Sequence, residues 1–255
     1  MHIRGAVLEE TGRQRPYAHT RHAVVDRASV VPVGNDVPAE IAALFGCAVL
    51  TGGGAVLNVA KPRPEDSLMV VGLGGVGMAA LLTAKAIGVE RIIAVDRMPE
   101  KLTTAQELGA TETYTPDRVR HERIRARYVL ECAGHPAAFE TAYAATSPGG
   151  TTITVGLPAP DATVTLPPLT LTAEARTIVG SYLGSAVPAR DIPRYEQMWR
   201  AGLLPVERLI SARIELDAIN AAMDHLSAGE AIRQIVTFPP AAARPAGVQG
   251  KSMAQ

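Results

Sequence analysis

Residues 67–96 carry the residue types and spacing of a phosphate-binding turn. The glycines of a G-x-G-x-x-G pattern, Gly72, Gly74 and Gly77, follow an apolar β-branched run and open a helical pattern. In such a turn the first glycine allows the tight bend, the second lets the backbone approach a pyrophosphate, and the third allows the helix to pack closely on the strand. The first N–H groups of the helix then face the anion. With the acid that ends the next apolar run, Asp96, this context predicts dinucleotide binding.

The acid at position 96 also bears on which dinucleotide is bound. A carboxylate at the end of the second strand accepts hydrogen bonds from a ribose diol and repels a 2′-phosphate, so Asp96 favours NAD. Arg97 beside it keeps NADP as the minority alternative, and the other interpretation of Asp96 is a cap for the following helix. Gly75 and Val76, inside the turn, complete the predicted phosphate contacts.

Strands and helices that could position these residues alternate along the chain from Ser67. The sequence predicts strands at 67–72, 91–96, 111–114, 128–132 and 151–156, and helices at 75–87, 99–109 and 136–146. Such alternation predicts an α/β fold with a doubly wound parallel sheet, and the ligand at the carboxyl ends of its strands.

The flanking segments predict less regular structure. Before the turn we expect strands at 2–8 and 22–32, and a helix that begins at Pro38 and ends before a turn at Gly52–Gly54. After the sheet we expect a helix at 188–201, a helix at 218–228 with Asp217 as its N-cap, and a closing strand at 234–238. The tail 239–255 has a composition typical of disorder.

Composition limits the classes of partner. The 25 basic residues balance the 25 acidic ones, so no overall field favours nucleic acid or an anionic membrane. Two cysteines are too few for a disulfide framework, and the first residues lack the basic and apolar regions of a secretory signal, so we expect a cytoplasmic protein. An arginine run could still suit a phosphate-rich partner, although a solvated face is favoured: Arg118, Arg120, Arg123, Arg125 and Arg127.

From about residue 31 to residue 238 the chain resembles the medium-chain dehydrogenase/reductase superfamily, specifically its zinc-type alcohol dehydrogenases. The matching stretches, in family order, are 45–56, 71–77, 91–96, 108–111, 154–158 and 232–238. The resemblance implies a Rossmann-type domain with a truncated GroES-like catalytic lobe. It divides the chain into a lobe remnant at 1–59, an NAD(P)-binding domain at 60–200, a closing segment at 201–238 and the tail.

The resemblance also implies roles for individual residues. Lys101 matches a lysine on the adenine side, although a solvated helix charge suits it equally. Arg233 matches an arginine that contacts the pyrophosphate, and Cys132 lies at a strand end near adenosine. Val155, Gly156 and Leu157 match a backbone stretch that holds the carboxamide, while their side chains look like ordinary core. Thr51 matches a threonine against the nicotinamide; its other interpretation is a helix residue before the glycine turn.

The zinc chemistry of the family is not expected here. A catalytic zinc needs three protein ligands, and Cys47 alone matches one; as a side chain, Cys47 is favoured to be a buried thiol. No residue is identified as catalytic, and Cys47 and Thr51 are only candidates. Without zinc, Thr51, Tyr17, His19 or His22 would have to stabilise a developing alkoxide.

Two functions from different classes remain open. The first is an NAD(H)-dependent oxidoreductase of alcohol dehydrogenase type, without zinc, that acts on a small alcohol or carbonyl compound. The alternative is a non-catalytic NAD(H)-binding sensor or assembly partner; a third interpretation is a degenerate product of an internal deletion. Because the segment at 177–184 resembles the region through which family members dimerise, we also expect a homodimer.

Overall fold

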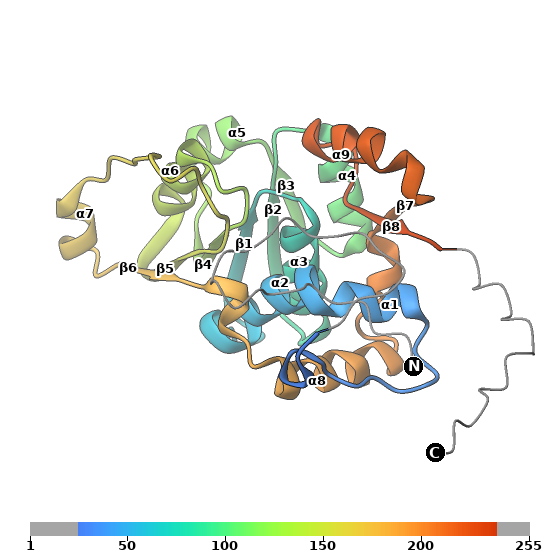
Figure 1. Cartoon of the computed structure of the whole chain (residues 1–255). Coiled ribbons are helices and arrows are strands. Elements are labelled where there is room, and N and C mark those ends of the chain that lie inside the picture. Colours follow the sequence, from blue (N-terminus) through green and yellow to red (C-terminus); the bar gives the residue numbers. More distant parts are fainter. Residues whose placement is uncertain (1–24, 239–255) are drawn as a thin grey trace, which may run out of the picture.

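A computed structural model describes residues 25–238, and a six-stranded parallel sheet runs through the middle of them (Figure 1). The strand order is β3-β2-β1-β4-β5-β6, and all neighbouring pairs are parallel. The strands are β1 Ser67–Val71, β2 Arg91–Val95, β3 Glu112–Tyr114, β4 Ala126–Glu131, β5 Thr146–Thr154 and β6 Thr177–Gly180. The order reverses direction at β1, which confirms the predicted doubly wound topology.

Helices cover both faces of this sheet. Side chains alternate along each strand, so Leu68 and Val70 enter one apolar core while Met69 and Val71 enter a second on the other face. The helices are α3 Gly75–Ala86, α4 Pro99–Leu108, α5 Pro116–His121, α6 Pro136–Ala144, α7 Pro168–Ala173 and α8 Pro188–Arg200. Because both faces are buried, the central strands β1 and β2 are nearly continuous apolar runs, which is why the sequence located them closely.

The N-terminal part of the larger core is one long helix, Ala39–Ala60. It consists of α1 Ala39–Leu44, the π-helical η2 Phe45–Val49, α2 Leu50–Gly54 and the π-helical η3 Ala55–Ala60. Its length and mean hydropathy of 1.7 would suffice to cross a membrane, but 67% of that apolar stretch is buried inside the protein, as in a core helix.

The predicted turn at Gly52–Gly54 is wrong, because all three glycines lie inside this helix. A Cβ on Gly52 would lie 2.1 Å from the carbonyl oxygen of Val76, and one on Gly54 would lie 2.5 Å from the carbonyl oxygen of Gly184. These glycines therefore let the helix approach two backbone segments closely. Close approach, and not a bend, is the reason for glycine here.

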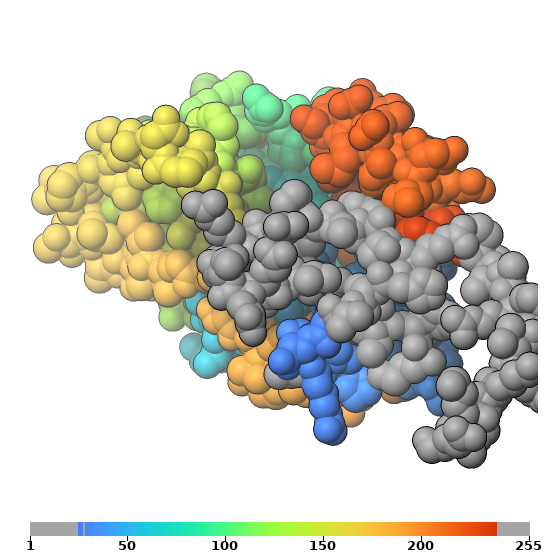
Figure 2. All heavy atoms as spheres, viewed as in Figure 1, coloured from blue at the N-terminus to red at the C-terminus, as the bar shows by residue number. Residues whose placement is uncertain are grey.

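The C-terminal part adds a small second sheet and a helix. β7 Ile210–Ile214 and β8 Arg233–Val236 pair in parallel, and α9 Ile219–Ser227 lies between them in the sequence. The prediction of Asp217 as the N-cap of this helix is wrong, because Asp217 lies in the 3-10 turn η6 Leu216–Ala218 and the N-cap is Ala218. Figure 2 shows this segment as a surface lobe at the opposite end of the molecule from α7.

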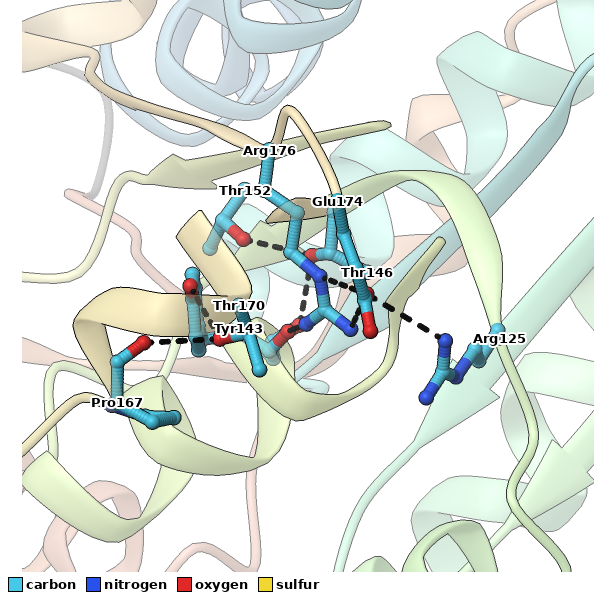
Figure 3. Close-up of polar contacts among 9 residues, drawn as sticks. Arg125, Tyr143, Thr146, Thr152, Pro167, Thr170, Glu174 and Arg176 are labelled. Carbon is cyan, nitrogen blue, oxygen red and sulfur yellow. Dashed lines mark hydrogen bonds and ion pairs between the residues drawn. The ribbon is translucent and has the colours of Figure 1, made fainter. Parts of the chain in front are cut away.

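The outer edge of the sheet is fixed by a buried arginine (Figure 3). Arg176, at the start of β6, donates hydrogen bonds to the carbonyl oxygen of Tyr143 and to the Glu174 carboxylate. The Tyr143 hydroxyl is 2.9 Å from Oγ1 of Thr170 on α7. These contacts hold α6, α7 and β6 together at the edge.

Some predictions on the flanks differ from the structure or lie outside it. Over residues 25–32 the regular element is a 3-10 turn, η1 Arg27–Ser29, and not the expected strand. The expected strand at 2–8, the candidates Tyr17, His19 and His22, and the tail at 239–255 lie outside the described residues. The domain boundaries stay predictions.

Candidate dinucleotide-binding site

The glycine turn joins β1 to α3 with the expected strain and spacing. Gly72 has φ +94°, and a Cβ there would lie 2.7 Å from the backbone nitrogen of Ala133. A Cβ on Gly77 would lie 2.0 Å from the carbonyl oxygen of Gly72. Above Gly74, the N-cap of α3, a Cβ would meet no described residue within 4 Å, and no side chain among residues 25–238 caps this helix end. The described side chains therefore leave the first N–H groups of α3 without a cap, as an anion site requires.

Arg233 places a second positive group at the same point. Its side chain extends from β8 over the turn, so that a Cβ on Gly75 would lie 2.1 Å from Nε. This Nε is buried and has no hydrogen-bond partner among the described residues. A guanidinium beside a helix N-terminus is unfavourable unless an anion lies against both. The pair therefore fits the pyrophosphate of a dinucleotide, which is the role that the resemblance implies for Arg233.

Asp96 connects the turn to the next helix. Its Oδ2 accepts a hydrogen bond from the backbone N–H of Leu73 at 2.8 Å, and its Oδ1 accepts one from Met98 at 3.0 Å. Each oxygen keeps a second lone pair for a hydroxyl donor. The two interpretations of Asp96 are thus compatible, because the carboxylate that braces the loops still presents acceptors at the end of β2.

The two basic candidates beside Asp96 differ in their surroundings. Arg97 is exposed. Lys101, on α4, is half-buried, and its Nζ lies 3.3 Å from the position of a Cβ on Gly229, just after α9. Lys101 therefore reaches the carboxyl end of α9, where a cation is favourable, and is not simply a solvated helix charge.

The remaining cofactor candidates lie at the carboxyl ends of β4 and β5. Cys132 follows β4 and is half-buried, and burial raises the pKa of its thiol. Val155 is buried, as expected for core. Leu157 is 77% exposed, so the expectation of a core side chain is wrong there. Leu157 lies in the loop that follows β5, at the surface of the candidate site.

The two catalytic candidates lie on the long helix. Thr51 is buried within α2. Cys47 is exposed, which corrects the expectation of a buried thiol: in the π-helical η2 the buried positions are Phe45, Ala48 and Val49. In the part of the chain that the structure describes, no group of three or more histidine, cysteine and acidic residues could hold a metal ion. The described residues thus do not fit a catalytic zinc.

The arginine run is largely neutralised by neighbouring acids. Arg118 pairs with Glu122 at 2.8 Å, and Arg120 pairs with Asp117. Two further ion pairs join the run to other segments: Arg125 to Glu174 at 3.6 Å and Arg127 to Asp66 at 3.2 Å. These contacts favour the solvated-face interpretation over a phosphate-binding patch.

One polar residue at this edge was not among the sequence candidates. Glu131, the last residue of β4, is only 1% exposed. Burial raises the pKa of its carboxyl, against the lowering effect of backbone N–H groups that point at it. One feature of the sequence could have pointed to Glu131: it is an acid at the end of an apolar strand and directly precedes Cys-Ala-Gly.

The parallel sheet, its strand order and the glycine turn define a Rossmann-type α/β protein. Residues 75–201 match the zinc-binding dehydrogenase family. The chain is 38% identical over 225 residues to a geraniol dehydrogenase from Castellaniella defragrans, and 30% identical over 229 residues to alcohol dehydrogenase 1 from Pisum sativum. Each match covers 85% of this chain and 60% of the relative.

Solved structures agree with these matches. An alcohol dehydrogenase zinc-binding domain protein from Burkholderia ambifaria superposes with a TM-score of 0.79 at 31% identity, covering 85% of this chain and 60% of that one. Benzyl alcohol dehydrogenase from Acinetobacter calcoaceticus gives 0.78 at 30% identity, covering 83% and 60%. The chain is thus similar over most of its length to alcohol dehydrogenases of the medium-chain dehydrogenase/reductase family, and it spans about 60% of the length of these relatives.

Proposed function

We propose that this protein is an NAD(H)-dependent oxidoreductase of alcohol dehydrogenase type that works on an alcohol/carbonyl pair without zinc. The observation that carries the proposal is the buried Arg233 Nε, which has no partner among the described residues and faces the N-terminus of α3 over Gly75. Two positive groups held against each other need an anion between them. Relatives named alcohol and geraniol dehydrogenase support the class of reaction.

The chain's residues divide the work of holding the cofactor. Arg233 and the first N–H groups of α3 would bind the pyrophosphate, Asp96 would accept from the adenosine ribose, and the backbone at 155–157 would hold the carboxamide. When bound, the nicotinamide supplies or accepts a hydride. The Asp96 carboxylate supports NAD over NADP, since it would repel a 2′-phosphate. Zinc independence is proposed because Cys47 has no neighbouring ligand set in the described chain.

Binding is the first test of this proposal. NADH would be titrated into the wild-type protein and into Arg233→Met, with NADPH as competitor. The wild type should bind NADH in the micromolar range and prefer it to NADPH, and Arg233→Met should weaken binding about 10- to 100-fold, the value of a lost hydrogen bond to a charged group. Arg213→Met is the matched control, because Arg213 pairs with Glu40 on the surface, and it should bind normally.

Turnover separates the enzyme from the non-catalytic alternative. NADH consumption would be followed with a panel of aldehydes and ketones in the presence of a metal chelator. NADH consumption that requires a higher NADH concentration in Arg233→Met than in the wild type supports the oxidoreductase. Tight NADH binding with no consumption for any carbonyl compound supports an NAD(H)-binding sensor instead, and binding of neither nucleotide overturns both.

We also propose that the protein forms a homodimer through the β6 edge of the sheet. β6 ends the strand order, so one side of it lacks a neighbouring strand among the described residues. Exposed apolar side chains flank it, including Leu169 on α7 at 75% and Tyr182 at 64%. Arg176 holds this edge rigid (Figure 3). An unpaired edge with apolar flanks is a typical pairing surface.

A further inference from the structure

Glu131 is a buried acid that has no basic partner among the described residues. It closes β4, is 1% exposed, and forms no ion pair with any residue in the described range. Its Oε1 accepts two hydrogen bonds, from the backbone N–H groups of Ala133 and Gly134, both at 2.8 Å. A buried charged group is unfavourable unless it is fully hydrogen-bonded. Here the compensation comes from the backbone of the loop that follows β4.

The main chain of the same residue holds the loop that follows β5. The carbonyl oxygen of Glu131 accepts from the backbone N–H groups of Val155 at 2.9 Å and Gly156 at 3.0 Å. Glu131 thus fixes the loop after β4 through its side chain and the loop after β5 through its backbone. The carboxylate also borders the second loop, because a Cβ on Gly156 would lie 3.0 Å from Oε2.

The two loops lie in backbone-to-backbone contact at this point. A Cβ on Gly156 would lie 2.1 Å from the backbone nitrogen of Gly134, and one on Gly134 would lie 2.7 Å from the carbonyl oxygen of Leu157. Gly134 also has φ +67°, a backbone conformation that residues other than glycine rarely adopt. No side chain separates the loops, so the hydrogen bonds at Glu131 set the distance between them.

We propose that Glu131 is a positioning residue that fixes the 155–157 backbone and thereby places the nicotinamide half of the bound cofactor. This inference rests on the proposed function. Glu131 acts through the loops and does not itself touch the cofactor. The groups proposed for the adenosine and pyrophosphate half, Asp96, Arg233 and the start of α3, form no hydrogen bond with Glu131. Cys132, the adenosine-side candidate beside this loop, is held separately, because its backbone N–H donates to the carbonyl oxygen of Val71 at 2.8 Å. Disturbing Glu131 should therefore weaken binding of the nicotinamide half more than binding of the adenosine half.

The carboxylate is the suitable group because it has two acceptor oxygens and no donor. In Glu131→Gln one oxygen still accepts from the loop after β4, but the amide N–H₂ replaces Oε2 beside Gly156. This N–H₂ donor would then lie beside Gly156, whose own N–H already donates to the Glu131 carbonyl oxygen, so two donors would lie together without an acceptor between them. The second loop should move away while the chain keeps its fold.

The test compares NADH with ADP-ribose, which lacks the nicotinamide ring, by calorimetric titration of the full chain. Glu131→Gln should raise the Kd for NADH about tenfold, or about 1.4 kcal/mol, and change the Kd for ADP-ribose less than about twofold. Glu112→Gln is the control, because Glu112 on β3 forms an ion pair with Arg91 on β2. This substitution should leave the Kd values of NADH and ADP-ribose unchanged. Thermal melting of each variant shows that it is folded.

Each outcome decides the matter. Equal weakening of both ligands, or of neither, would overturn the positioning role of Glu131. If Glu131→Gln does not fold, Gly156→Ala changes the same loop spacing from the other side, and it should show the same selective loss of NADH; equal effects there would also overturn the inference. A wild-type protein that binds neither ligand would overturn the proposed function itself, and this inference with it.

Discussion

Arg233 and Asp96 act on the glycine turn from different sides and in different ways. Asp96 accepts two backbone hydrogen bonds and so holds the turn in place before any ligand arrives. Arg233 has a buried donor with no described partner, so its electrostatic energy improves only when an anion binds. The first residue organises the site in advance, and the second supplies the affinity. This division keeps the reorganisation on binding small.

At the residue scale, Asp191 gives a pH-dependent prediction. Its carboxylate accepts from Arg190, from the backbone of Val187 and from Asn58 on the long helix. The Arg190 guanidinium, with these donors, lowers the pKa of Asp191. A group whose pKa is lowered by folding contributes its full stabilisation above its unfolded-state pKa of about 3.9. This stabilisation is lost as the pH falls through the folded-state pKa.

Asp191→Asn should therefore lower the free energy of unfolding by about 1.5–3 kcal/mol at pH 7, and the difference from wild type should shrink below about pH 4. Urea unfolding at both pH values measures this. Asp36→Asn, at an exposed ion pair with Arg200, is the comparison and should have the smaller effect. A pH-independent loss for Asp191→Asn would contradict the electrostatic explanation.

The sequence located the candidate site residues best where local backbone geometry fixes their positions. The glycines and Asp96 were found from spacing alone, because a turn, a helix start and a strand end fix their positions. Arg233 came only from the resemblance, since 156 residues separate it from Gly77 and no local pattern connects them. Glu131 was missed because its role depends on backbone contacts between two loops, which a sequence pattern does not show.

At the element scale, the long helix shows how one residue type can serve opposite purposes. Gly46 and Gly52 lie one and a half to two turns apart in it. A Cβ on Gly46 would meet no atom of the described residues within 4 Å, whereas one on Gly52 would lie 2.1 Å from the Val76 carbonyl oxygen. Sequence reasoning assigned Gly52–Gly54 to a turn because clustered glycines usually mark one. Packing against α3 overrides that tendency.

Alanine substitutions at Gly46 and Gly52 should therefore change the free energy of unfolding in opposite directions. Gly46→Ala should raise the free energy of unfolding by about 0.5–1 kcal/mol through helix propensity. Gly52→Ala should lower it by about 1–3 kcal/mol through overpacking. Because Val76 belongs to the glycine turn, Gly52→Ala should also weaken NADH binding. Denaturant unfolding and NADH titration measure both, and equal effects of the two substitutions would show that the helix tolerates a wider spacing.

Elements outside the parallel sheet were harder to predict. β7 and α7 were missed, and the strand expected at 22–32 is not formed in its described part. These segments are short and half exposed, so their apolar pattern is weak and their structure depends on tertiary contacts. The ion pair of Arg213 on β7 with Glu40 on α1, at 2.7 Å, is one such contact between distant parts of the chain.

At the scale of the whole molecule, the proposed dimer predicts a change of mass on substitution. The wild-type protein should have the mass of two chains at micromolar concentration by light scattering. Tyr182→Lys should shift the equilibrium toward one chain, because it places a charge in the apolar edge. Met223→Lys is the matched control: Met223 is 55% exposed, but it lies on α9 at the other end of the molecule (Figure 2).

A wild-type protein that stays a single chain at all concentrations would remove the dimer. A Met223→Lys protein that dissociates while Tyr182→Lys does not would place the interface on the α9 side instead. Neither result would affect the proposed cofactor site, because the glycine turn and Arg233 belong to one chain.

The long apolar helix has a consequence for how the protein is made. Its glycines contact Tyr195 and Gly184, which are translated much later than the helix itself. About 140 residues separate Gly53 from Tyr195, which takes on the order of ten seconds at common rates of synthesis. During that time a helix apolar enough to cross a membrane has no completed surface to cover it. Chaperone capture of the nascent chain should thus begin at this helix and end once α8 has emerged.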